Sequence, residues 1–451
     1  MMRFSEIYRR AIPLGIANMS LVALVFTDMI MLGQHQLMEM AASSILMQAY
    51  LIILVLGEGL VFGFSPLYGK SLSLANPAPR YRTIVAVLGV LLLYSLIGLM
   101  LLANVGWLAG LVPQTTALAQ ASETYILLLG LALLPNLLFI LTWELLAFDE
   151  RERVVLLGAL LQFVVNVLAN YALIFGKFGF PAMGIVGAGI ATLLSATSGM
   201  VFLFSTFFLK GDRLQQLLSA AREPVSELLA LAGKCVRTGL PIGVTMLVTI
   251  GFLSFSVLQM TEFGATAVVA HNAVLQLNEM IVVFALGFGE FAAIRFASMA
   301  IPSHADAQAE LRRILLAASA LFVPVLVLAF FFRGQIPGLF FNPDDPHFNE
   351  AAQRAMEFAT LSIPLLIINL VLLIVQGALR GRGIVARPAL LISFFYWGLT
   401  VPITSALLFW FEVPPLTIWI GLLVGFFAAT VSLLVFFTRT NLIGDVLEKD
   451  E

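Results

Sequence analysis

A single carboxylate, Asp28, interrupts the apolar stretch Leu21–Leu32, and no Lys or Arg lies between Arg10 and Lys70. An ionised carboxylate well inside a membrane helix costs about 2.5–3.5 kcal/mol on insertion scales. Its helical neighbours three, four and seven positions away are apolar, so none of them can pair with it. We therefore expect Asp28 to face a hydrated cavity or a partner on another helix, as an ion-handling residue. The alternative is a carboxylate near a helix end that reaches the membrane interface.

Two asparagines, Asn166 and Asn170, lie four residues apart in another apolar stretch and so share one helix face. Amides that face hydrocarbon are costly, so this face should point into a helix bundle. With Asp28 they would supply a carboxylate and two amide oxygens, which suit Na⁺ or can hold a protonated aspartate. Thr192 is a candidate fourth member of this ion-coupling set. The alternative is a set of interhelical hydrogen bonds without an ion.

Further polar residues within apolar stretches could line a substrate cavity. They are Glu58, Glu144, Gln276, Asn278 and Glu279. Glu144 is close to Asp149, so a structural role at the membrane interface is an equal alternative for it. For the stretch 276–279, the equal alternative is that its polar side chains make satisfied packing contacts and line no cavity. His271, near the outer end of an apolar stretch, is either a pH-sensitive group or, as is commoner for such a position, structural.

Composition places these residues in a membrane protein. The 451 residues are 61% hydrophobic and 11% charged, whereas soluble chains carry about 25% charged residues. Long continuous apolar stretches favour helices over a membrane barrel. The net charge of −2 gives no indication of nucleic-acid binding, and the single cysteine, Cys235, excludes an intramolecular disulfide. Nucleotide-binding and metal-binding motifs are absent, so we expect no cofactor, and uphill transport would need an ion gradient.

About 20 apolar residues cross a bilayer, and the chain accordingly predicts an all-α polytopic protein with twelve spans. They run near 11–34, 45–70, 84–106, 122–147, 155–176, 186–209, 232–260, 266–294, 313–333, 354–379, 387–411 and 415–438. With the N-terminus in the cytoplasm, every Lys and Arg except Lys177, Arg333 and Arg354 falls on the cytoplasmic side. This distribution predicts a multi-pass protein of the inner membrane with both termini inside. The first apolar run is long enough to span, so no cleavable signal peptide is expected.

An internal repeat divides the chain near its midpoint. The motif 11–16 is echoed by 239–244, and Gly57–Gly59 by Gly287–Gly289, about 230 residues later. We therefore predict an N-terminal six-helix lobe (1–212), a cytoplasmic linker (213–230) and a C-terminal six-helix lobe (231–451). An even number of helices per half gives both halves the same orientation, and such paired bundles place the substrate near the membrane midplane.

These motifs together resemble the multidrug and toxic compound extrusion (MATE) family, in its NorM-like bacterial branch. The resemblance is carried by Thr27–Gly33, Asn166–Gly179, Gly184–Thr192, Gly239–Pro241, Gly264–His271 and Gln376–Gly381. It implies two pseudo-symmetric six-helix bundles in a V-shaped fold, and a transporter, not an enzyme, that exports bulky, often cationic or amphipathic compounds in exchange for H⁺ or Na⁺. The family's ion site in the N-terminal lobe maps onto Asp28, Asn166, Asn170 and Thr192.

The chain departs from the family at three positions. NorM-type members carry acidic residues in spans seven and ten, where this sequence has Thr249 and Asn369. Several members have an aspartate at the position of Asn170. These departures place the coupling on Asp28 and favour H⁺ over Na⁺, because one carboxylate with neutral partners is a sparse Na⁺ site. Thr249 and Asn369 are retained as candidate cavity residues.

Other functions are weighed against this prediction. A lipid-linked precursor flippase of the same superfamily would use basic cavity residues, but nearly every Lys and Arg here lies at a cytoplasmic edge. A dedicated natural-product exporter remains open. A membrane-embedded enzyme would need a catalytic constellation that four scattered histidines do not supply, and the duplication disfavours a channel or receptor. We expect a monomer in the lipid bilayer that acts on a small-molecule substrate and binds no nucleic acid.

Overall fold

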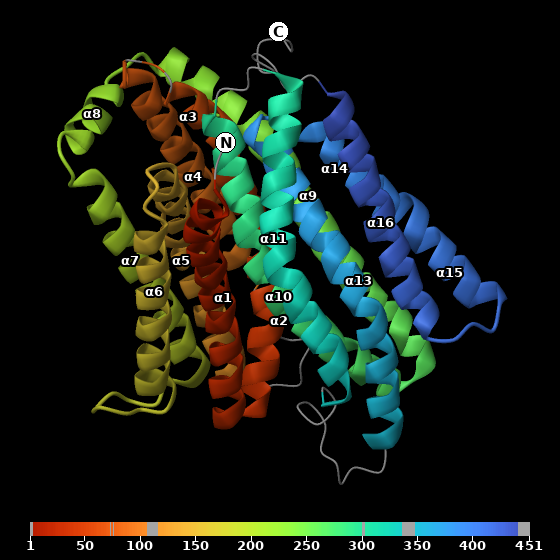
Figure 1. Ribbon diagram of the computed structural model, residues 1–451. Helices are drawn as coiled ribbons and strands as arrows, with labels where there is room; N and C mark the ends of the chain where they lie inside the picture. Colours follow the sequence, from red (N-terminus) through yellow and green to blue (C-terminus); the bar gives the residue numbers. More distant parts are fainter. Residues whose placement is uncertain are drawn as a thin grey trace. The chain divides into compact units, whose positions relative to one another are not determined.

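The computed structural model describes residues 3–72, 74, 76–105, 116–299, 303–335 and 348–440, and within these ranges it contains helices and no strand (Figure 1). The α-helices are α1 (Phe4–His35), α2 (Leu37–Phe62), α3 (Ser65–Ser71), α4 (Ala78–Ala103), α5 (Thr116–Phe148), α6 (Glu152–Ile174), α7 (Gly184–Phe208), α8 (Arg213–Ala220), α9 (Val225–Met260), α10 (Ala265–Ser298), α11 (His304–Phe332), α13 (Phe348–Gly381), α14 (Ala386–Ser393), α15 (Val401–Trp410) and α16 (Leu416–Arg439). Shorter segments are η2 (Thr261–Phe263), η3 (Arg333–Gln335) and the π-helical η4 (Phe394–Thr400).

The number of membrane spans is confirmed. In the described part of the chain, twelve helical segments are long and apolar enough to cross a bilayer, from Phe4–His35 to Leu416–Arg439. Each of them overlaps one of the predicted spans, so the count from hydropathy and charge holds along the whole series. The C-terminal tail, 441–451, lies outside the described residues.

The helices form two compact units. One unit comprises 16–244, and the other comprises 1–15 together with 245–451. In the first, α7 packs along both α5 and α6, and α2 and α4 pack against α5. In the second, α13 packs along α10 and against α16 and α11. The N-terminal parts of α1 and α9 thus belong to the unit formed mainly by the other half of the chain.

Two matched glycine contacts account for this exchange. A Cβ on Gly287 of α10 would lie 2.3 Å from the backbone nitrogen of Gly15 on α1, and a Cβ on Gly59 of α2 would lie 2.3 Å from that of Gly243 on α9. At these crossings only glycine lets the two backbones approach so closely. Gly243 follows Gly15 by 228 positions, and Gly287 follows Gly59 by the same number, so the two contacts are equivalent under the repeat and set its register. Gly59, and not Gly57, is therefore the counterpart of Gly287.

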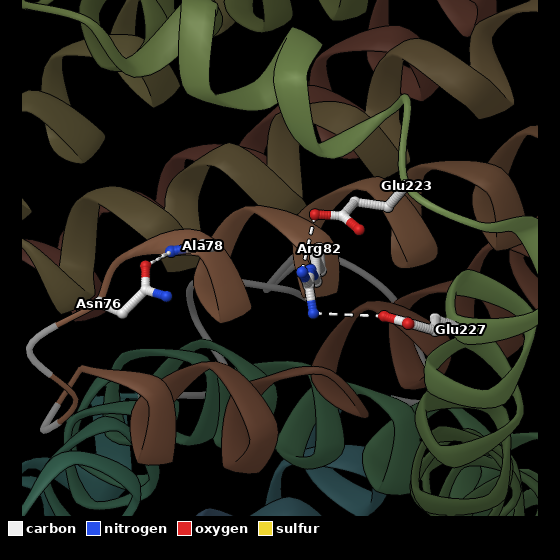
Figure 2. Close-up of polar contacts among 5 residues, drawn as sticks. All are labelled: Asn76, Ala78, Arg82, Glu223 and Glu227. Atoms are coloured by element: carbon white, nitrogen blue, oxygen red, sulfur yellow. Dashed lines mark hydrogen bonds and ion pairs between the residues drawn. The ribbon is translucent and has the colours of Figure 1, made fainter.

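The predicted linker, 213–230, is ordered and attached to the unit 16–244. Its helix α8 packs against α4 and α7. Figure 2 shows Arg82 of α4 donating to Glu223 (2.7 Å) and to Glu227 at the start of α9 (3.2 Å). In the same view, the Asn76 side chain accepts from the backbone N–H of Ala78 (2.9 Å) at the beginning of α4. The linker therefore continues directly from one span into the next through helices.

The eleventh span is interrupted by the π-helical segment η4. Pro402 follows it and lacks the N–H that would bond to the carbonyl of Gly398, which favours a wider turn here. The Thr400 hydroxyl donates to the carbonyl of Phe395, five residues earlier (2.7 Å). Tyr396, within this segment, is fully buried, and its ring stacks on the ring of Phe252 on α9.

Candidate functional site

The structure brings together the four residues of the predicted ion-coupling set. Asp28 lies in the last two turns of α1, Asn166 and Asn170 lie on one face of α6, and Thr192 lies in the third turn of α7. Asp28, Asn166 and Asn170 are buried, with 5%, 1% and 0% of their surface exposed, and Thr192 is half-buried. Asp28 was expected to face either a hydrated cavity or a partner on another helix, and the structure places it against side chains of α6 and α7.

Both carboxylate oxygens of Asp28 accept hydrogen bonds from neutral donors. The Nδ2 amide of Asn170 donates to Oδ1 of Asp28 and also to Oδ1 of Asn166 (3.0 Å). The Thr192 hydroxyl lies 3.3 Å from Oδ2 of Asp28 and 3.0 Å from the carbonyl of Ala188, so its single hydrogen is shared between them. The asparagine on α6 thus holds the carboxylate through its nitrogen, not through the oxygen that a cation would require.

The charge of this site is not balanced by a basic residue. In the described ranges, no Lys, Arg or His makes an ion pair or hydrogen bond to Asp28. Among the same residues, no group of three or more His, Cys, Asp or Glu is placed to hold a metal ion. Oδ1 of Asn170 is buried without a hydrogen-bond partner, so a half-turn of that amide would present an oxygen to a cation. The site can therefore accept a proton, or a monovalent cation after that rotation.

A polar stripe extends from this cluster along α6 and was not predicted. Gln162 precedes Asn166 by one turn, is equally buried, and donates to Oδ1 of Asn136 on α5 (3.2 Å). Asn136 in turn donates to the hydroxyl of Tyr50 on α2 (2.8 Å). The spacing of Gln162, Asn166 and Asn170 by four residues was the signal in the sequence. It places three amides on one buried helix face.

Of the two other acidic candidates of the first half, Glu144 contacts Ser65, outside the ion-coupling set, and Glu58 interacts electrostatically with Tyr50 at the end of the polar stripe. Glu144 is fully buried, and its Oε2 accepts from the Ser65 hydroxyl (2.8 Å). This contact favours the structural alternative for Glu144. Glu58 is half-buried in α2.

The candidates of the second half do not form one cluster. Asn278 is buried with its amide nitrogen unpartnered, Gln276 is half-buried and Glu279 is exposed, so this stretch of α10 faces several directions. Thr249 donates to the carbonyl of Thr245 on its own helix (2.9 Å), and no described hydrogen bond joins it to the half-buried Asn369.

A different polar cluster occupies the second half, and the sequence reasoning missed it. Ser256 of α9 contacts His271 of α10 (3.0 Å), and Gln259 donates to Thr404 and Ser405 of α15 (both 3.0 Å). The repeat itself carried the signal, because Ser256 follows Asp28 by the same 228 positions that separate the paired glycines.

Comparisons with known proteins agree with the geometry. A family model described as MatE matches residues 13–172 and 241–405. The chain is 29% identical over 428 residues to the probable multidrug resistance protein NorM of Brucella suis, covering 92% of this chain and 88% of the relative. It is 23% identical to the protein of the same name from Agrobacterium fabrum, over 94% of this chain and 91% of the relative.

Solved structures share the fold. A crystal structure of MATE in the bent conformation matches with a TM-score of 0.82 at 16% identity, over 96% of this chain and 94% of that one. A mutant of a Vibrio cholerae MATE transporter matches with a TM-score of 0.82 at 15% identity, over 97% and 98% of the two chains. The family model covers well over half of the sequence and the fold match extends over nearly all of it. The chain therefore belongs to the MatE family of membrane transporters, as its motifs indicated, and is not an enzyme.

Proposed function

We propose that this MatE protein is a cation-coupled antiporter that exports bulky, often cationic or amphipathic compounds across the inner membrane by alternating access, with H⁺ as the coupling ion. Its relatives named as multidrug resistance proteins support drug export. The observation that carries the coupling is Asp28, a buried carboxylate held only by neutral donors from two other helices.

The hydrogen bonds of Asp28 link its protonation to the arrangement of helices. Two donors, from Asn170 on α6 and Thr192 on α7, favour the ionised carboxylate. A protonated carboxyl is itself a donor, and the Thr192 hydroxyl can accept from it when its own hydrogen goes to the carbonyl of Ala188. Binding a proton therefore removes a donor to Asp28 and reverses the hydrogen bond between α1 and α7. A difference of a few kcal/mol between two arrangements is enough for a transport cycle.

The test is export of ethidium from proteoliposomes under an imposed pH gradient or an imposed Na⁺ gradient. We expect the pH gradient to drive export by the unmodified protein. Asp28→Asn should abolish it, because the amide keeps the volume of the carboxyl but cannot release a proton. Glu58→Gln is the comparison variant, since it removes another carboxylate, half-buried on α2 of the same unit and a candidate cavity residue; whatever its effect on the amount of ethidium exported, that export should still depend on the pH gradient.

Three results would contradict parts of this proposal. Export driven only by the Na⁺ gradient would make Na⁺ the coupling ion. Normal export by Asp28→Asn would remove Asp28 from the coupling. Loss of export in Glu58→Gln, with Asp28→Asn still active, would transfer the role to α2.

We also propose that both termini are cytoplasmic, on the distribution of basic residues. The native thiol cannot test this, because Cys235 is fully buried within α9 and would stay unlabelled from either side. Two introduced cysteines can: Phe178→Cys, in the connection between α6 and α7 (76% exposed), and Leu218→Cys, on α8 (57% exposed). In intact cells an impermeant thiol reagent should label the first and not the second. The reverse pattern would invert the orientation.

A further inference from the structure

One face of α9 carries a buried set of contacts that the proposed coupling at Asp28 does not use. Phe252, Ser256 and Gln259 lie on this face at intervals of four and three residues. The ring of Phe252 stacks on Tyr396 of η4 (4.5 Å between centroids), Ser256 meets His271, and Gln259 meets α15. All five of these side chains are at least nine-tenths buried. Tyr396 itself lies within the π-helical segment η4 of the eleventh span.

The hydrogen bonds around His271 determine which ring nitrogen carries the proton. The Ser256 hydroxyl lies 2.7 Å from the carbonyl of Leu253, and a carbonyl can only accept, so the hydroxyl hydrogen is used there. Ser256 Oγ must then accept from Nε2 of His271, 3.0 Å away. The neutral imidazole is therefore the Nε2–H tautomer, and Nδ1 is left as a bare acceptor.

This bare acceptor lies in a packed aromatic environment. The imidazole contacts Trp419 edge to face (5.2 Å between centroids, 74°) and Phe358 (6.3 Å, 87°), and those two rings stack on each other. Both His271 and Trp419 have 0% of their surface exposed. Neither Nδ1 of His271 nor Nε1 of Trp419 has a hydrogen-bond partner. A buried polar atom without a partner is costly, and such exceptions call for a functional explanation.

The repeat relates this cluster to the ion-coupling set. With the separation of 228 positions fixed by the glycine contacts, Ser256 is the counterpart of Asp28, and His271 is the counterpart of Ser43 on α2. The first half thus has its ionisable side chain on the first helix of the repeat and a serine on the second. The second half has the serine on the first helix and the ionisable side chain on the second.

Within the described ranges, no charged side chain makes an ion pair or hydrogen bond with the imidazole. Its contacts there are with Ser256, Phe358 and Trp419, all uncharged. The acidic residues on η2, α10 and α13 are Glu262, Glu279, Glu290, Glu350 and Glu357, and none of them makes a described hydrogen bond to His271. Glu350 is instead bound by Thr266 (3.0 Å) and by Arg354 (2.7 Å) near the end of the helices.

We propose that Nδ1 of His271 is a second proton-binding site, in the unit 245–451, and that its occupation is linked to loosening of the contacts with Ser256 and Trp419. The site is fully packed, so a proton is the ligand that it can take without opening. An imidazolium without an anion is disfavoured in such surroundings, so the charged form favours a looser arrangement of α9, α10 and α16. The role of this proton in transport rests on the proposed ion coupling, but the binding itself does not.

The experiment is fluorine NMR of protein labelled with 5-fluorotryptophan, in detergent, from about pH 8, above the usual range of histidine titration, down to the lowest pH at which the protein stays folded. The resonance of Trp419 is assigned by its loss in Trp419→Phe. We expect this resonance to shift with one midpoint, while the resonance of Trp143, in the other unit, stays unchanged. His271→Gln should abolish the shift. Asp28→Asn should keep it, which separates this proposal from the proposed coupling at Asp28.

Several outcomes would overturn the proposal. They are a Trp419 resonance that does not respond to pH, the same titration in His271→Gln, or loss of the titration in Asp28→Asn. If His271→Gln does not fold, Ser256→Ala provides the second test, because it removes the acceptor of Nε2–H. An unchanged midpoint in Ser256→Ala would exclude His271 as the titrating group.

Discussion

Each half of the chain has a buried polar cluster at the equivalent place in the repeat, but the two clusters are made of different residues. In the unit 16–244, Asp28 is surrounded by amide and hydroxyl donors, so the cluster is anionic when it holds no proton. In the unit 245–451, the equivalent position is Ser256, and the ionisable residue is His271, which is neutral when it holds no extra proton. The duplication therefore preserved the place of the polar cluster but not its charge.

This difference has a consequence for the ions that each cluster can take. A buried carboxylate attracts a proton or a metal cation, whereas an imidazole with a bare nitrogen takes only a proton among common monovalent cations. Thr249 and Asn369, which replace the acidic residues expected from the family, add no charge to the second half. Under the proposed coupling, a cation other than H⁺ would therefore bind at Asp28, in the first half.

The largest effect is expected for alanine substitutions at the two glycine crossings, and these variants test whether the two halves depend on the crossings equally. Gly59→Ala would place a Cβ 2.3 Å from the backbone of Gly243, and Gly287→Ala would place one 2.3 Å from the backbone of Gly15. No side chain can move aside, so each variant should lose at least the roughly 1–3 kcal/mol typical of overpacking. Thermal unfolding in detergent measures this loss.

Gly89→Ala is the matched control, because a Cβ at Gly89 on α4 meets nothing within 4 Å. Its stability should stay the same or rise slightly, since alanine favours helices. If only Gly59→Ala or only Gly287→Ala is destabilised, the α2–α9 and α1–α10 crossings do not contribute equally to stability, and the two halves are not equivalent there.

Much of this arrangement was predictable from the sequence, for a physical reason. A charged or amide side chain in a membrane span is so costly that its presence forces a partner, and this argument alone grouped Asp28 with Asn166 and Asn170. The same argument could have pointed to Gln259 but not to Ser256 or Thr404, because serine and threonine cost little free energy in a helix, where their hydroxyls bond to the backbone of the preceding turn. Ser256 and Thr404 both do so here. Their second contacts, to other helices, depend on packing that no single residue type reveals.

Other features depended on geometry that hydropathy does not carry. The π-helical turn at 394–400 needs Pro402 at one place in the span, and the burial of Cys235 follows from the crossing of α9 with α2. The sequence pattern paired Gly57 with Gly287, whereas the backbone contacts pair Gly59 with Gly287, so the predicted register differs from the observed one by two residues at this point. Several glycines near this point fit the pattern equally well, and only the backbone contacts distinguish them.

A smaller loss of stability is expected when one hydrogen-bonding side chain is removed from each cluster, and its size should differ between the Asp28 cluster and the His271 cluster. Asn170→Ala removes a donor to the Asp28 carboxylate, and a buried charge that loses a hydrogen bond costs about 1.5–3 kcal/mol. Thr404→Ala removes one of two partners of Gln259, whose amide keeps Ser405 at 3.0 Å, so about 0.5–1.5 kcal/mol is expected. Thermal unfolding of both variants at several pH values measures the two losses.

The pH dependence of these losses carries the comparison. The donor of Asn170 stabilises the ionised carboxylate, so the penalty of Asn170→Ala should be present when Asp28 is ionised and should shrink as the pH falls and Asp28 takes up its proton. Gln259 and Thr404 do not titrate, so the penalty of Thr404→Ala should be the same at every pH at which His271 keeps one protonation state. Equal and pH-independent penalties in both variants would mean that Asp28 stays protonated throughout. The first cluster would then be as neutral as the second, and the charge difference between the halves would disappear.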